Sequence, residues 1–118
     1  MHSTAFVSGP YTAIPHLRST IDNIAIATDC AVWLWDHDYY TFCPHLNSRH
    51  FDTFANVPES RYIDFYLSIL RSGIIDLLVL LPHWELSSGT GKEFKLARLL
   101  QIPIYLWFPG TDQLIRVP

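Results

Sequence analysis

The sequence predicts an α/β fold in which one open parallel sheet lies between two layers of helices, as a three-layer sandwich. Short apolar runs alternate along the chain with amphipathic stretches, which is the order that parallel strands and crossover helices produce. Residues 74–81 form an almost continuous apolar run interrupted only by Asp76, as is typical of a central strand covered on both faces. The chain has 118 residues, 49% of them hydrophobic, and contains no repeat and no Gly/Ser-rich linker. Residues 1–118 are therefore expected to form a single domain.

Start and stop signals bound each predicted element. Gly9-Pro10 ends the first strand, a Ser-x-x-Asp cap at Ser19 begins the first helix, Pro44 stops the second strand, and Gly73 stops the second helix. Residues 47–58 show no clear period and are expected to form a loop. The predicted strands form a sheet of the Rossmann or flavodoxin-like kind and are residues 4–8, 39–43, 74–81, 102–108 and, at the edge, 114–117. The predicted helices are residues 19–35, 59–72 and 92–100. The apolar face of the first helix is assigned to these residues: Ile21, Ile24, Ala25, Thr28, Ala31, Val32 and Trp35.

Composition and charge exclude several classes of function. A net charge of -3 with only eight Lys plus Arg argues against a broad nucleic-acid surface, which needs many phosphate contacts. No apolar stretch approaches the roughly 18 residues that a spanning helix needs, and residues 1–15 lack the basic start and apolar core of a leader. Two cysteines, Cys30 and Cys43, provide no disulfide framework. These observations predict a cytoplasmic protein that binds neither a nucleic-acid polymer nor a membrane.

A metal centre is not expected. Cys43, His45 and His50 lie close in sequence, but their spacing matches no usual zinc pattern and a fourth ligand is missing. The same Cys43 and His45 make no convincing nucleophile pair, because no third group that would orient them is evident.

Three polar segments are predicted to meet at one edge of the sheet. Residues 8–12, 43–47 and 83–91 each follow a strand, and ligands of open α/β sheets bind beyond the carboxyl ends of the strands. In the last of these segments, Ser-Ser-Gly-Thr-Gly leads to Lys-Glu, so small residues at a strand-to-helix turn precede Glu93.

Two interpretations of that turn stay open. Its backbone N–H groups suit an anion, although the absence of GxxxxGK[ST] excludes a P-loop. Alternatively, Thr90 and Glu93 form a capping box in which Glu93 bonds back to the N–H of Thr90. Tyr11 has two interpretations as well: a phenol aimed at a carboxylate of this turn, or a surface residue of a tight turn.

The segments that carry this chemistry occur in an order known from one superfamily. They are Ala5-Phe6-Val7-Ser8-Gly9-Pro10-Tyr11; Asn23, Ala27 and Ala31; Pro44-His45; the run from Asp76 to Pro82 followed by Trp84-Glu85; and Ser87-x-Gly89-x-Gly91-x-Glu93 with Ala97 and Ile102-Pro103. Over about 100 residues the chain thereby resembles the nucleoside 2-deoxyribosyltransferase-like superfamily, especially its short bacterial and phage members.

The resemblance implies roles for individual residues. Glu93 corresponds to the nucleophile that attacks C1′ of a nucleoside or nucleotide, and Tyr11 to the residue that orients it. A carboxylate in that place captures or stabilises an oxocarbenium-like centre, as in retaining glycosidases. The turn before it implies that Ser87, Ser88 and Gly89 hold the 5′ end of the sugar or its phosphate. The other residues expected at the substrate are Ser8, Gly9, Pro10, His45, His83, Trp84 and Gly91.

One position departs from the family pattern. The family carries an aspartate in the second helix, and the corresponding position here is Ser68. Asp64, one helical turn earlier, shares the face of Ser68 and is expected to donate the proton to the leaving group in its place, with His45 or His83 as alternatives. His83 also replaces the usual glycine before Trp84.

The sequence thus predicts an N-glycosidase, which is a hydrolase, or a deoxyribosyltransferase that cleaves the N-glycosidic bond of a nucleoside or nucleoside 5′-monophosphate. Water as acceptor gives hydrolysis, and a second base gives transfer. Two alternatives stay open: a non-catalytic nucleotide-binding or sensing module, motivated by Ser68, and a structural interaction protein. No metal and no organic cofactor is implied. We expect a homo-oligomer, because related enzymes complete their pockets across subunit contacts and because the chain is rich in aromatic residues.

Overall fold

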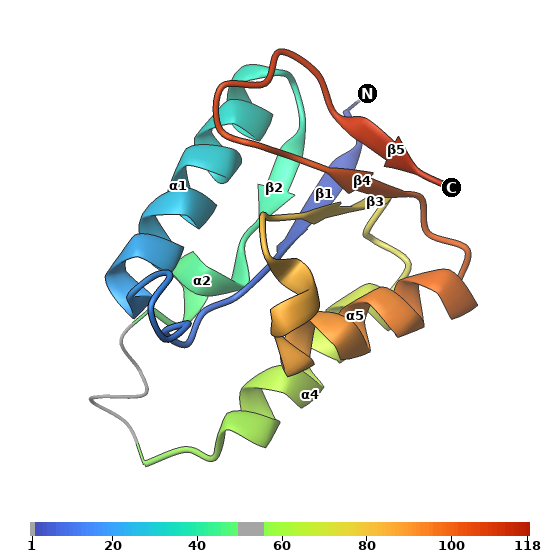
Figure 1. Ribbon diagram of the computed structural model, residues 1–118. Coiled ribbons are helices and arrows are strands. Elements are labelled where there is room, and N and C mark those ends of the chain that lie inside the picture. The colour runs from blue at the N-terminus through green and yellow to red at the C-terminus, as the bar shows by residue number, and fades with distance from the viewer. Residues whose placement is uncertain (1, 50–55) are drawn as a thin grey trace.

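A computed structural model describes residues 2–49 and 56–118 and contains a five-stranded sheet in the order β2-β1-β3-β4-β5 (Figure 1). The predicted α/β class is confirmed. The sheet is mixed, however, because β5 runs antiparallel to β4 while the other neighbours are parallel. Only residues 107–114 connect β4 to β5, which is too short for the crossover that a parallel pair requires. The strands are β1 (Thr4–Ser8), β2 (Tyr40–Phe42), β3 (Leu77–Leu80), β4 (Ile104–Leu106) and β5 (Ile115–Val117).

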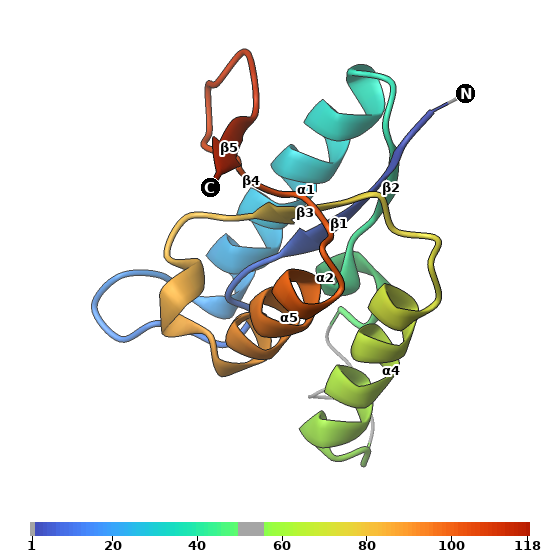
Figure 2. The same ribbon diagram turned by 90° about the vertical axis from the view of Figure 1, so that its right-hand side faces the viewer.

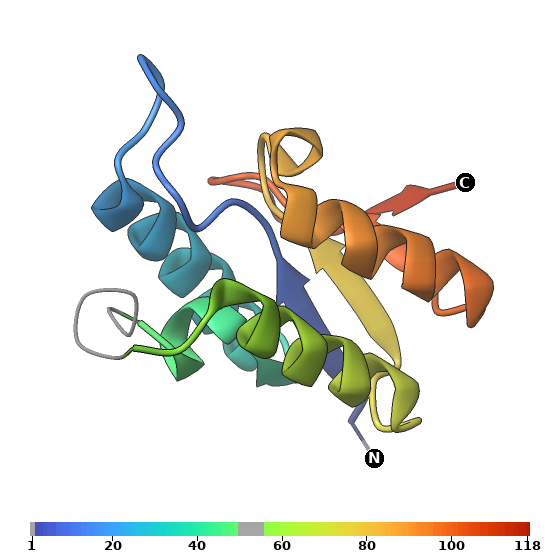
Figure 3. The ribbon, with the colours of Figure 1, turned by 90° about the horizontal axis from the view of Figure 1, so that it is seen from below.

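Helices cover both faces of this sheet. On one face lies α1 (Thr20–Asp36), and on the other lie α4 (Glu59–Arg71) and α5 (Ser88–Leu99) (Figures 1 and 2). The last two lie side by side below the sheet (Figure 3). A short helix, α2 (Pro44–Asn47), begins at Pro44, since a proline suits the first helical position. Within the described residues, no helix has both the length and the apolar character needed to cross a bilayer.

Alternation along β1 divides the core between the two faces. Ala5 and Val7 belong to the buried cluster beneath α1, whereas Phe6 belongs to the cluster beneath α4 and α5. Strand β3 is buried along its whole length, as predicted for the apolar run, and it pairs with β1 and β4. The two central strands are therefore fixed by burial on both sides.

Three sequence-based expectations need correction. The helix predicted from Lys92 begins at Ser88, because Ser87 caps it. The segment expected to be a loop at residues 43–47 holds the helical turn α2, and part of the loop expected at 47–58, residues 50–55, lies outside the described residues. The apolar face assigned to α1 is divided, since Ile21, Ala25, Val32 and Trp35 are exposed while these residues are buried: Asn23, Ile24, Ala27, Cys30, Ala31 and Leu34.

The order of the strands places a crevice between β1 and β3. The chain leaves β1 for β2 on one side and later crosses to β3 on the other, and ligands of open α/β sheets bind at such a reversal, beyond the carboxyl ends of the strands. Gly9 follows β1 there and lies against Leu81, which follows β3. A Cβ atom on Gly9 would come within 2.6 Å of the Leu81 Cβ, so this approach requires glycine.

We expect Gly9→Ala to destabilise the protein by about 1–3 kcal/mol, because the added methyl group would force the ends of β1 and β3 apart. Urea denaturation monitored by tryptophan fluorescence measures this change. Gly91→Ala is the matched control: its Cβ would meet nothing within 4 Å, and replacing a helical glycine stabilises a helix slightly. Equal stabilities of the two variants would contradict the prediction.

Candidate active site

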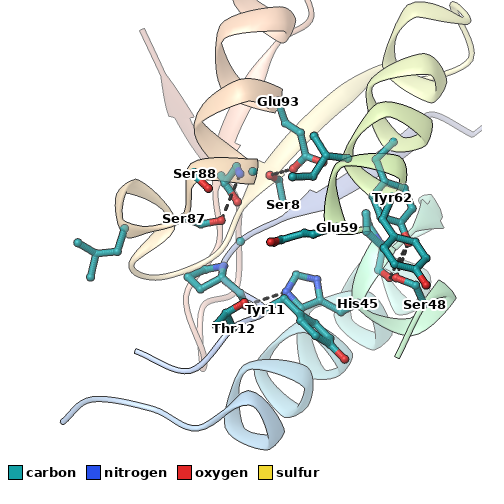
Figure 4. Close-up of a pocket in the computed structure, with 18 of the residues that line it drawn as sticks. Ser8, Tyr11, Thr12, His45, Ser48, Glu59, Tyr62, Ser87, Ser88 and Glu93 are labelled. Carbon is teal, nitrogen blue, oxygen red and sulfur yellow. Dashed lines mark hydrogen bonds between the residues drawn. The ribbon is translucent and has the colours of Figure 1, made fainter. Parts of the chain in front are cut away.

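A cavity of about 670 Å³ opens at the carboxyl end of β1. Its walls come from the loop after β1, from α2, from the first half of α4 and from the amino-terminal turn of α5 (Figure 4). The lining combines hydroxyl groups, tyrosine rings and two carboxylates, those of Glu59 and Glu93. This is the edge of the sheet at which the sequence predicts a site.

Glu93 is held inside this cavity by the end of β1. Its side chain is only 7% exposed, and the Ser8 Oγ donates a hydrogen bond to its Oε1 at 2.5 Å. Burial raises the pKa of the Glu93 carboxyl to about 7, and the hydrogen bond from Ser8 opposes part of that rise. The group therefore changes its charge near neutral pH, which suits a residue that takes part in chemistry.

The capping-box alternative for Glu93 is wrong. Ser87 is the N-cap of α5, and its Oγ accepts a hydrogen bond from the N–H of Thr90 at 3.2 Å. Thr90 consequently lies inside the helix, and Glu93 lies one turn further along and bonds to Ser8 instead. The Glu93 carboxylate therefore lies in the pocket wall and does not cap the helix.

The amino terminus of α5 faces the same cavity. Ser87, Ser88 and Gly89 line it, and the first N–H groups of a helix have no partner within the helix. A Cβ on Gly89 would make only ordinary contact with Ile63 at 3.8 Å, so the fold does not require glycine there. The missing side chain keeps this end of the pocket open for a polar or anionic group.

His45 forms the opposite wall. It is 4% exposed, and its Nε2 lies 2.8 Å from the carbonyl oxygen of Pro10. Because a carbonyl only accepts, Nε2 carries the hydrogen and the neutral ring leaves Nδ1 as an acceptor. Burial lowers the pKa of His45, which favours this neutral form. The imidazole therefore fixes the loop after β1.

Tyr11 lies beside His45 and away from Glu93 (Figure 4). The two rings are 5.9 Å apart between centroids at an angle of 57°. Asn23, which is 1% exposed, donates from Nδ2 to the carbonyl oxygens of Tyr11 and Thr12 at 3.1 and 2.9 Å. The backbone at Tyr11 is therefore anchored by α1, and the Ser8 hydroxyl is recorded as a donor to Glu93.

The structure brings most of the predicted site residues together and leaves four outside. Asp64 is exposed on the outer side of α4, and Gly91 is absent from the cavity lining. His83 is exposed at the start of a 3-10 turn (Trp84–Leu86), and the Trp84 ring stacks on Phe94 with centroids 4.8 Å apart. The predicted residues that line the cavity are Ser8, Gly9, Pro10, Tyr11, His45, Ser87, Ser88, Gly89 and Glu93.

Several lining residues are not among those predicted from the sequence, and two of them, Glu59 and Tyr62, lie on α4. They share one face of α4 with Ile63 and Tyr66, at the spacing of successive helical turns. Ser68, at the position of the family aspartate, is exposed, and its Oγ donates to the Phe65 carbonyl at 2.5 Å. Counting back by helical turns from the apolar residues Ile63 and Tyr66 identifies Glu59 as the acid that α4 brings to the site.

Comparisons with protein-family models, with curated proteins and with solved structures found no match. Among the described residues, no three His, Cys, Asp or Glu side chains gather closely enough to hold a metal ion.

The raised pKa of Glu93 makes stability depend on pH in a defined direction. The folded state holds this proton more tightly than the unfolded chain, whose pKa is near 4.5, so the stabilisation is fully present below about pH 4.5 and is lost as the pH rises through about 7. This shift corresponds to roughly 3 kcal/mol. We expect the wild-type free energy of unfolding, minus that of Glu93→Gln, to fall by about this amount between pH 4.5 and 8 in urea titrations.

The same variant supplies the control. His45, whose pKa burial lowers, acts in the opposite direction as the pH falls, but it is present in both proteins and cancels in the difference. Parallel pH profiles for wild type and Glu93→Gln would contradict the assigned environment of Glu93.

Proposed function

We propose that the cavity binds a nucleoside or a nucleoside 5′-monophosphate and that Glu93 cleaves the N-glycosidic bond. The observation that carries this proposal is the buried carboxylate of Glu93 in the pocket wall, oriented by the Ser8 hydroxyl at 2.5 Å. The resemblance to the nucleoside 2-deoxyribosyltransferase-like superfamily assigns the nucleophile to this same residue. We also propose a flavodoxin-like order of the parallel strands and a cytoplasmic location, which the free thiols of Cys30 and Cys43 suit.

The reaction proceeds in two displacements. An oxygen of ionised Glu93 forms a bond to C1′ while the bond from C1′ to the base nitrogen breaks, and the electron pair leaves with the base, which takes up a proton. Water then attacks C1′, gives up a proton and releases Glu93, so the products are the free sugar or sugar phosphate and the base. A second base in place of water gives transfer. The hydrogen bond from Ser8 holds Glu93 in one orientation for both steps.

The leaving base belongs at the α4 side of the pocket. Tyr62 and Tyr66 line that side, and aromatic rings provide surfaces on which a base stacks. Glu59 lies on the same helical face, and we assign it to the base as the group that delivers the proton. Asp64, expected in this role from sequence, is exposed and absent from the lining, so it does not enter the proposal.

The first test of this proposal is release of free base from a panel of ribonucleosides, deoxyribonucleosides and their 5′-monophosphates. Glu93→Gln and Glu93→Ala are each expected to lower kcat/KM by about 1000-fold or more, because they remove the nucleophile. For the wild type, kcat/KM is expected to rise with pH through about 7 as Glu93 ionises. Wild-type activity in the Glu93→Gln variant, which circular dichroism checks for folding, would refute the assignment.

The two acids of α4 provide a matched pair of variants. Glu59→Gln is expected to lower kcat/KM by about 100-fold, whereas Asp64→Asn leaves it unchanged, since only the first side chain lines the cavity. The loss in Glu59→Gln should shrink on a 7-methylpurine nucleoside, whose base leaves without protonation. An equal loss on both types of substrate would exclude proton delivery by Glu59 and leave only a structural effect.

A second candidate is a non-catalytic nucleotide sensor. The observation that favours it is Ser68, which stands at the position of the family aspartate, is exposed, and donates its hydroxyl to the carbonyl oxygen of Phe65. Nucleotide-dependent stabilisation without release of base, with or without an acceptor base, would establish this function instead. A purely structural role is disfavoured by the hydroxyl groups and carboxylates that line the cavity.

A further inference from the structure

Helix α1 carries a second apolar stripe on its solvent side. The residues are Ile21, Ala25, Thr28, Val32 and Trp35, and their spacing of four, three, four and three residues is the heptad pattern of a helix that packs against another helix. The buried side of α1 contacts the sheet through other residues, among them Ile24, Ala27 and Leu34. Figure 1 shows α1 at the edge of the molecule with the sheet on its inner side. We call the outer stripe the α1 seam.

The α1 seam is too exposed to be part of this protein's own core. Ile21 is 71% exposed, and Val32 and Trp35 are each 54% exposed. The Trp35 ring lies 6.2 Å from that of Tyr40, which is half-exposed at the start of the edge strand β2 and extends the apolar surface. Together these side chains leave roughly 400–500 Å² of surface in water, which equals the largest patch of a typical monomer and about half of one side of a stable interface.

One flank of the seam is uniformly acidic. Asp22, Asp29 and Asp36 recur at intervals of seven residues, beside the positions of the seam. If Ala25 and Val32 are a positions of the heptad, the three aspartates are its e positions, where charges select the partner. The g positions on the other flank are Ile24 and Ala31, which are buried in this protein. Asp22 also accepts a hydrogen bond from the Ser19 N–H at the helix cap, and Arg49 lines a shallow hollow beside Asp29, so Asp36 is the member of the row farthest from a described cation or donor.

We propose that the α1 seam docks an amphipathic helix of a partner protein that is apolar along its seam and rich in Lys or Arg beside it. A second copy of this chain fits poorly. Antiparallel pairing would set the aspartate row against itself, and parallel pairing would set it against positions such as Ile24 that are already covered. A basic amphipathic helix matches both the apolar spacing of the seam and its charge. The α1 seam lies on the opposite face of the sheet from α4 and α5, so docking there is independent of the proposed reaction.

The experiment uses a fluorescein-labelled peptide of three heptads with Ile at a, Leu at d and Lys at e and g, titrated with the full chain and followed by anisotropy. Lysine at both flanks keeps the peptide from pairing with itself. The comparison peptide has Glu in place of Lys. We expect at least tenfold tighter binding of the Lys peptide at 50 mM salt, with the preference declining as salt is raised. Equal binding of the two peptides, or no binding of either, would overturn the proposal.

Variants locate the contact. Val32→Glu and Ile21→Glu are each expected to weaken binding of the Lys peptide at least tenfold, whereas Leu99→Glu, at a 79% exposed leucine of α5, leaves it unchanged. The double variant Asp29→Lys with Asp36→Lys is expected to reverse the preference toward the Glu peptide, a gain that misfolding cannot produce. Sedimentation of the wild type as a dimer that Val32→Glu dissociates would identify a second copy as the occupant and refute the proposed partner.

Discussion

The hydrogen bond from Ser8 to Glu93 joins two parts of the chain that lie 85 residues apart, and the arrangement of the pocket depends on it. Burying a carboxyl group costs free energy unless a polar group compensates it, so Glu93 needs a donor at a fixed place. That place is set by the last residue of β1, whose neighbour Gly9 packs directly on Leu81. The position of Glu93 is set in turn by Ser87, which caps α5 and so determines which residues of that helix face β1.

The buried face of α5 is less apolar than stability alone would require. Its buried members are Thr90, Glu93 and Ala97, and the two nearer the amino terminus are polar. The Oγ1 of Thr90 has no hydrogen-bond partner among the described residues. An apolar residue in place of Glu93 would avoid the pH-dependent cost that burial imposes on the carboxyl. Polar groups retained at one end of a packed helix, against a cavity, are typical of a site kept for binding or chemistry at the expense of stability.

Elements that depend on a local residue pattern can be predicted from this sequence. The face that a helix turns toward the pocket or the sheet depends on tertiary packing and cannot be predicted in the same way. The apolar run of β3 and the cap at Ser19 could be predicted because both signals are local. Ser87, Ser88 and Thr90 are all plausible caps by residue type, and only the path of the chain after β3 selects Ser87. For α4, the family position at Ser68 points to Asp64 on the same helical face, but that face is exposed and Glu59 lines the cavity instead. In α1, the buried stripe and the exposed α1 seam are both apolar, so the sequence pattern alone combines them into one face.

The charges around the cavity bear on which substrate it accepts. Among the described lining residues there is no Lys and no Arg, burial favours the neutral form of His45, and Glu93 adds negative charge as it ionises near neutral pH. A phosphate group would find favourable partners only at the amino terminus of α5, where N–H groups and the hydroxyls of Ser87 and Ser88 converge. Repulsion from the ionised Glu93 carboxylate acts on a dianion in the rest of the pocket. For the proposed nucleoside substrate, the electrostatics therefore favour a neutral nucleoside, and they restrict the phosphate of a proposed nucleotide substrate to the α5 end.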